Sequence, residues 1–144
     1  MKILLLACLT LALCNVSWAD DGDDTVRQWV GKADAVFVGT LTEAPDGPAY
    51  REAGVANYGL KVRIDEVLKG DVGKGTVVVH LVRFESSDKD RLPFLAKGAQ
   101  CIFFVAPMRS SEIRRWATVD PWFAVQPFNT HLTNRVKTLS EKKE

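Results

Sequence analysis

Five short segments rich in β-branched and aromatic residues restrict this chain to a mainly β fold. Glycine, proline and charged residues separate them, which is the pattern of strands joined by turns. The segments are 34–43, 58–65, 76–84, 100–106 and 115–120. Residues 58–65 alternate apolar and polar side chains, as a half-buried strand does, whereas 100–106 is almost wholly apolar, as in a strand buried on both faces. Five strands favour a small, partly closed barrel over a sandwich, which usually needs about seven.

The pattern also predicts where these strands are irregular. Gly39 lies inside the first strand, where a glycine indicates a bulge or a tight bend. Val67 and Leu68 break the alternation of the second strand, as a bulge would. Residues 44–57 open with a proline- and glycine-rich turn cluster and are predicted to be a loop, which makes them a candidate binding surface.

An amphipathic stripe predicts a short helix ahead of the first strand. Thr25 and Gln28 have the spacing of a capping box, and the helix is expected to end near Lys32. Residues 20–24 hold four aspartates and are predicted to be a solvated acidic spacer rather than a metal site.

A second amphipathic helix is predicted at the C-terminus, over 129–141. Asn129 or Thr130 can cap it, because both side chains offer an oxygen to free backbone N–H groups. Leu132, Val136 and Leu139 then recur on one face of the helix.

The N-terminal residues 1–19 have the pattern of a secretory signal peptide. Lys2 precedes the short apolar run 3–14, and small residues precede a cleavage position between Ala19 and Asp20. The expected mature chain, 20–144, is a single domain that is exported, either periplasmic or secreted. Lipidation at Cys8 or Cys14 is the alternative, and only then is membrane attachment expected.

Removing this leader changes the charge and the cysteine count. The whole chain has 19 basic and 18 acidic residues, so losing Lys2 leaves 18 of each. A neutral exported domain has no bulk charge for binding nucleic acid, so we expect none as a partner. Cys101 becomes the only cysteine, which excludes an internal disulfide.

Three segments in this order, 33–41, 62–70 and 97–105, resemble the netrin-like domains, the group that includes the tissue inhibitors of metalloproteinases. The middle segment ends in Leu68-Lys69-Gly70, which is similar to the turn that follows the second strand of that family. The resemblance implies a five-stranded OB-like barrel of the cysteine-poor bacterial exported type, with the two helices added. It does not carry over metalloproteinase inhibition, which in that family depends on an N-terminal cysteine where this chain is expected to have Asp20.

Catalytic patterns are weak in this sequence. Cys101 and His80 on neighbouring strands could form a nucleophile and base, but Cys101 lies among apolar residues and is predicted to be a core residue. Glu85, Asp88 and Asp90 share one loop that is expected to be solvated. Neither a metal site nor a cofactor is predicted.

Aromatic residues near the C-terminus are the predicted binding residues. Trp122 and Phe123 form an apolar connector before the last helix, and Trp116 follows two arginines. The sequence thus predicts a non-catalytic exported binding module whose partner is a protein or an envelope component. The alternatives are a peptidase inhibitor and a small exported hydrolase that uses Cys101 or the loop carboxylates.

Overall fold

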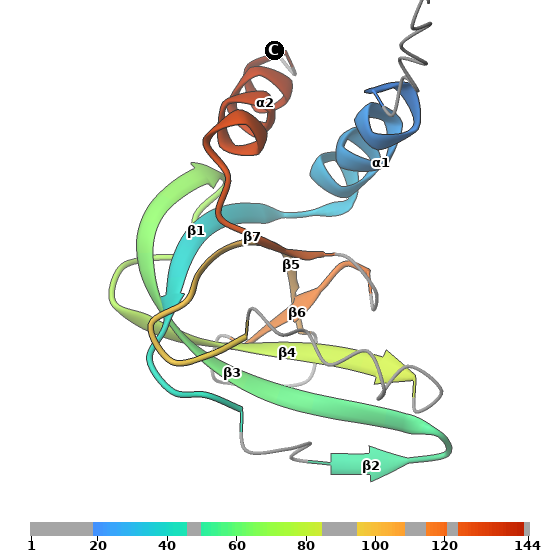
Figure 1. Cartoon of the computed structure of the whole chain (residues 1–144), viewed down its shortest axis with the longest axis vertical. Helices are drawn as coiled ribbons and strands as arrows, with labels where there is room; N and C mark the ends of the chain where they lie inside the picture. The colour runs from blue at the N-terminus through green and yellow to red at the C-terminus, as the bar shows by residue number, and fades with distance from the viewer. Residues whose placement is uncertain (1–18, 46–49, 85–94, 109–114, 121–123, 143–144) are drawn as a thin grey trace, which may run out of the picture.

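The computed structural model describes residues 19–45, 50–84, 95–108, 115–120 and 124–142, which form a mainly β structure with two helices (Figure 1). In chain order the elements are α1 (Ala19–Lys32), β1 (Ala35–Leu41), β2 (Tyr50–Glu52), β3 (Val55–Lys69), β4 (Thr76–Phe84), β5 (Gln100–Pro107), β6 (Trp116–Thr118), β7 (Val125–Pro127) and α2 (Thr130–Glu141). None of the helices in this described part is long and apolar enough to cross a membrane.

Five of the strands form a closed ring of hydrogen-bonded neighbours. β1 pairs antiparallel with both β3 and β5, and β3 pairs antiparallel with β4. β6 completes the ring, because it pairs antiparallel with β5 and parallel with β4. β7 extends the edge of β5, and β2 pairs with the first residues of β3.

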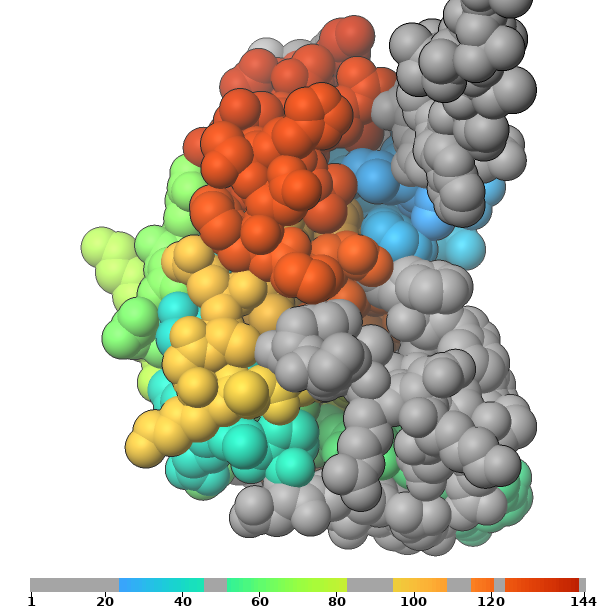
Figure 2. Space-filling view, viewed as in Figure 1, coloured from blue at the N-terminus to red at the C-terminus, as the bar shows by residue number. Residues whose placement is uncertain are grey.

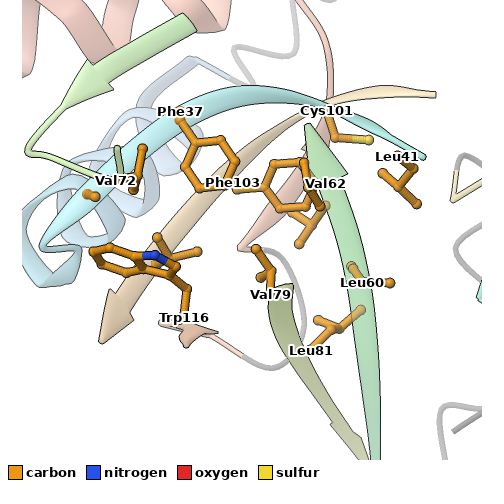
Figure 3. Packing of buried hydrophobic residues seen from close by; sticks show 13 residues of the cluster. Phe37, Leu41, Leu60, Val62, Val72, Val79, Leu81, Cys101, Phe103 and Trp116 are labelled. Carbon is orange, nitrogen blue, oxygen red and sulfur yellow. The ribbon is translucent and has the colours of Figure 1, made fainter. Parts of the chain in front are cut away.

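The inside of the ring is one apolar core. Phe37 of β1 and Phe103 of β5 stack at its centre, with ring centroids 5.1 Å apart (Figure 3). Val79 and Leu81 of β4 and Trp116 of β6 fill the side facing them. The ring is therefore a packed core and is held together mainly by apolar burial.

A second core lies on the outside of the ring, between the strands and the helices. Val36 of β1 and Phe104 of β5 face outward there, and α1 covers them with Trp29, whose ring centroid lies 5.3 Å from that of Phe104. α2 adds Val136 to the same cluster and packs beside α1 (Figure 2). β1 and β5 are thus buried on both faces, which explains why their sequences are apolar almost throughout.

The last residue of β3 and the turn after it attach α1 to the ring. The Lys69 ammonium donates hydrogen bonds to the carbonyl oxygens of Val30 (2.6 Å) and Ala33 (2.5 Å), at the end of α1 where carbonyls have no helical partner. Gly70 follows with φ +71°, and a Cβ built there would lie 2.2 Å from the carbonyl oxygen of Asp34. The chain can make this close approach only because residue 70 has no side chain.

Both predicted strand irregularities are confirmed. The pairing of β1 with β3 shifts register twice. Val36 pairs with Lys69 but Phe37 pairs with Val67, so Leu68 is opposite no residue of β1. Asp65 is skipped in the same way, just before Gly39 pairs with Ile64. A Cβ on Gly39 would lie 2.4 Å from Val62 Cγ1, so β1 and β3 approach too closely for any side chain there.

The predictions for β4 and α2 are also confirmed, including the Asn129 cap, whose side chain accepts from the backbone N–H groups of His131 and Leu132. Three predictions were wrong. The acidic spacer 20–24 lies within α1, which begins at Ala19. Residues 44–57 are only partly loop, since they contain β2 and the start of β3. No strand was predicted between residue 120 and the last helix, yet Val125–Pro127 form β7.

Gly70→Ala should unfold the protein far more easily than Gly73→Ala does. Both glycines have positive φ, +71° and +79°, but a Cβ at Gly73 meets nothing within 4 Å. Gly73→Ala should cost only the backbone strain, about 1–2 kcal/mol, whereas Gly70→Ala adds a clash and should cost roughly 3 kcal/mol or more. Urea unfolding of both variants measures the difference, and equal losses would contradict the close approach at Gly70.

Ala53→Asn should stabilise the β2–β3 hairpin. Ala53 has φ +48° and Gly54 +77°, so both turn residues adopt the left-handed conformation, which alanine disfavours and asparagine tolerates. The gain should be about 0.5–1 kcal/mol in thermal or urea unfolding. Ala44→Asn is the matched control, because Ala44 is also exposed but lacks positive φ. A gain of the same size at Ala44 would remove the backbone explanation.

Candidate functional site

Cys101 is a core residue, as predicted. It is 0% exposed on the inward face of β5 and belongs to the same apolar cluster as Phe103 and Val79 (Figure 3). Burial disfavours the thiolate and raises the pKa of Cys101 to about 11. A thiol in this state is a poor nucleophile, because the thiolate is the reactive form.

His80 lies on the opposite face of the sheet from Cys101. Its neighbours Val79 and Leu81 point into the ring core, and side chains alternate along a strand, so His80 points outward. Its Nδ1 is 3.1 Å from Asn57 Oδ1 on β3, and its Nε2 is buried with no hydrogen-bond partner. Burial, followed by the charge of Arg115, lowers the pKa of His80. The Cys101–His80 nucleophile and base are therefore not brought together.

Trp116, one of the three predicted binding residues, has a different role in the structure. Trp116 is only 6% exposed and belongs to the ring core, so its indole packs against core residues and is not accessible to a partner. The sequence pointed to it as a binding residue because two arginines precede it, whereas alternation within β6 turns its side chain into the core. Trp122 and Phe123 lie outside the described residues, and their binding role stays a prediction.

The other candidate residues for catalysis or metal binding lie outside the described residues or are not grouped into a site. Glu85, Asp88 and Asp90 lie outside the described residues. Among the residues that the structure does describe, no three histidine, cysteine or carboxylate side chains are grouped so that they could hold a metal ion.

A polar network crosses three strands on the outer face of the ring, just beyond the part that the helices cover. Asp65, the residue passed over in the β1–β3 register, accepts hydrogen bonds from Thr40 Oγ1 (2.6 Å), Gln100 Nε2 (3.1 Å) and Arg63 Nε (3.1 Å). Burial by itself would raise the pKa of the Asp65 carboxyl. The three hydrogen bonds and the charge of Arg63 outweigh it, so the pKa is lowered. The network fixes β1, β3 and β5 to one another at this point.

Phe128 lies beside this network and is the most exposed large apolar side chain of the described residues, at 43%. Its backbone N–H donates to the carbonyl oxygen of Gln100 (2.9 Å), which holds its backbone in place. It directly precedes the Asn129 cap, where an apolar residue often packs on the helix position four residues after the cap. That position is Thr133, so the usual apolar partner is missing.

Sequence reasoning missed Phe128 as a candidate. The signal was present, since an apolar residue precedes a well-defined helix cap and the expected apolar partner is replaced by a threonine. Its exposure nevertheless depends on the pairing of β7 with β5, which sequence patterns did not predict.

Comparison with known proteins assigns no family to the chain. No family model matches it, and no curated protein matches it either. The resemblance to netrin-like domains therefore stays a prediction.

Cys101 should react very slowly with thiol reagents in the folded protein. Its burial and raised pKa both reduce the thiolate available at neutral pH, so labelling should be at least about 100-fold slower than in the chain unfolded by denaturant. Peptide mass spectrometry distinguishes Cys101 from the other cysteines. Labelling of the native chain at a rate near that of the unfolded chain would contradict the core position and reopen the hydrolase hypothesis.

Proposed function

We propose that this chain is a non-catalytic exported binding module on an OB-like barrel of the netrin type. The ring supports the barrel part of the proposal: five strands in the order β1-β3-β4-β6-β5, closing on β1, with a single parallel pair. The bulged first pair and the long, curved β3 fit a small barrel, which needs such irregularities to close. Export of residues 20–144 is part of the same proposal and rests on the leader pattern alone.

The observation that carries the binding proposal is the placement of Phe128. An aromatic ring that stands exposed on an immobilised backbone loses little conformational entropy when a partner covers it. The Asp65 network beside it leaves few polar groups unsatisfied, since Thr40, Gln100 and Arg63 already bond to the carboxylate. A partner can therefore cover the network without stripping water from unpaired charges. We propose that this partner is a protein or an envelope component.

The two enzyme-related alternatives have less support. A hydrolase based on Cys101 would need a base beside the thiol, and His80 lies on the other face of the sheet. A peptidase inhibitor is one form of the binding module, and no separate observation among the described residues favours it.

Replacing Phe128 with a photoreactive phenylalanine analogue should capture a partner in intact cells. Val78 is the matched control position, since it is 37% exposed on β4 and Phe128 is 43% exposed. Adducts should form from position 128 and be absent from position 78. Phe128→Ser should lower recovery of the same partner about tenfold or more, the loss expected of an anchoring aromatic residue.

Circular dichroism of Phe128→Ser should match the unaltered chain, because the side chain is outside both cores. Equal adducts from both positions, or partner recovery unaffected by Phe128→Ser, would contradict binding through Phe128.

A further inference from the structure

The ring closes through a thin joint between β4 and β6. This β4–β6 joint consists of two residue pairs among the described residues, Val79 with Trp116 and His80 with Ala117. By comparison, β1 has six pairs with each neighbour, and β3 has nine with β4. Because backbone pairing and side-chain packing both grow with the number of pairs, the ring should open most easily at β6, which has two described pairs with β4 and three with β5.

Buried polar atoms without partners gather at the same joint. Within the described part of the chain they include His80 Nε2 on β4 and Trp116 Nε1 on β6, and both residues belong to the two β4–β6 pairs. Thr118 Oγ1 is also buried without a partner, but Thr118 pairs with Val105 of β5. A buried polar atom without a hydrogen bond disfavours the closed state, because water would satisfy the atom once the strands separate. The joint is therefore both short and poorly satisfied.

His80 is the group at this joint whose charge can change near neutral pH. Asn57 Oδ1 can only accept a hydrogen bond, so the Nδ1 facing it carries the proton and Nε2 is the basic nitrogen. Protonation of Nε2 would create a buried N–H donor with no acceptor. It would also place a positive charge near Arg115, the residue that directly precedes β6.

The other charged groups along the facing strand do not offset that charge. Gly59 of β3 and Ala117 of β6 are the residues directly opposite His80, and neither can accept a hydrogen bond through its side chain. Farther along the outer face of β3, Lys61 is paired with Glu43 at 3.0 Å. Beyond it, Arg63 is paired with Asp65 at 3.1 Å.

We propose that the β4–β6 joint is an acid-sensitive closure, in which protonation of His80 separates β6 from β4 and opens the ring. The lowered pKa of His80 in the closed state supports this. In the open state its pKa would return to about 6.5, so opening should increase as the pH falls below that value. The increase is at most about tenfold per pH unit and stops at the lower pKa of the closed state.

Native-state hydrogen exchange between pH 7.5 and 5 tests the proposal. Rates are corrected for the intrinsic effect of pH, and the β1–β3 amides of the same chain serve as the internal reference. Protection of β6 should fall as the pH decreases through about 6.5, while protection of the β1–β3 amides stays constant. His80→Gln should abolish this dependence. His131→Gln is the matched control, since His131 is exposed at the start of α2, and it should leave the dependence intact.

Arg115→Gln separates the proposed mechanism from a purely structural role of His80. Removing the guanidinium should raise the pKa of His80 in the closed state and thereby reduce the acid-induced loss of protection. NMR titration of His80 in the unaltered chain decides the matter even if His80→Gln fails to fold. A His80 pKa at or above about 6.5, or a β6 protection that does not change with pH, would overturn the proposal.

Discussion

The pairing of β1 with β5 is the contact on which the rest of the structure depends. Phe37 and Phe103 stack inside the ring, and the residues next to them, Val36 and Phe104, form the base of the outer core. Because successive side chains on a strand point to opposite faces, one pair of strands supplies both cores at once. Loss of this pairing would open the ring and remove the surface on which α1 and α2 pack.

The residues that carry the resemblance to netrin-like domains serve this architecture. Gly39 allows β1 and β3 to approach, Lys69 binds the carbonyl end of α1, and Gly70 lets the chain pass close to Asp34. Each has a structural reason that holds whatever the protein binds. A resemblance based on such residues is thus an argument about fold, and function must be sought in residues that the fold does not need, such as Phe128.

The sequence predicted best those elements whose signals lie within their own residues, and it missed elements that are defined by contacts with other segments. β4 and α2 were predicted because their signals, a β-branched run and the Asn129 cap, lie within the elements themselves. The β2–β3 hairpin was missed because Ala53 occupies a left-handed turn position that normally holds asparagine, aspartate or glycine. β6 lies within the strand predicted over 115–120, whereas β7, only three residues long, was missed because its pairing with β5 alone defines it. The same limit applied to the candidate site: apolar neighbours predicted that Cys101 is buried, but nothing local predicted that Trp116 is also buried.

Two short strands cover the edge of β5 opposite β1, and Phe128, the described residue proposed for binding, lies on the same edge. β7 pairs with the first half of this edge and β6 with the second. Phe104 lies between the two halves, and its N–H donates to the carbonyl oxygen of Ala124 while its carbonyl oxygen accepts from the N–H of Val119. One buried residue of β5 therefore holds both Val119 and Ala124. Phe128 follows β7 on the same edge, where its N–H donates to the carbonyl oxygen of Gln100, so its backbone is held by a strand that β1 pairs with on the other side.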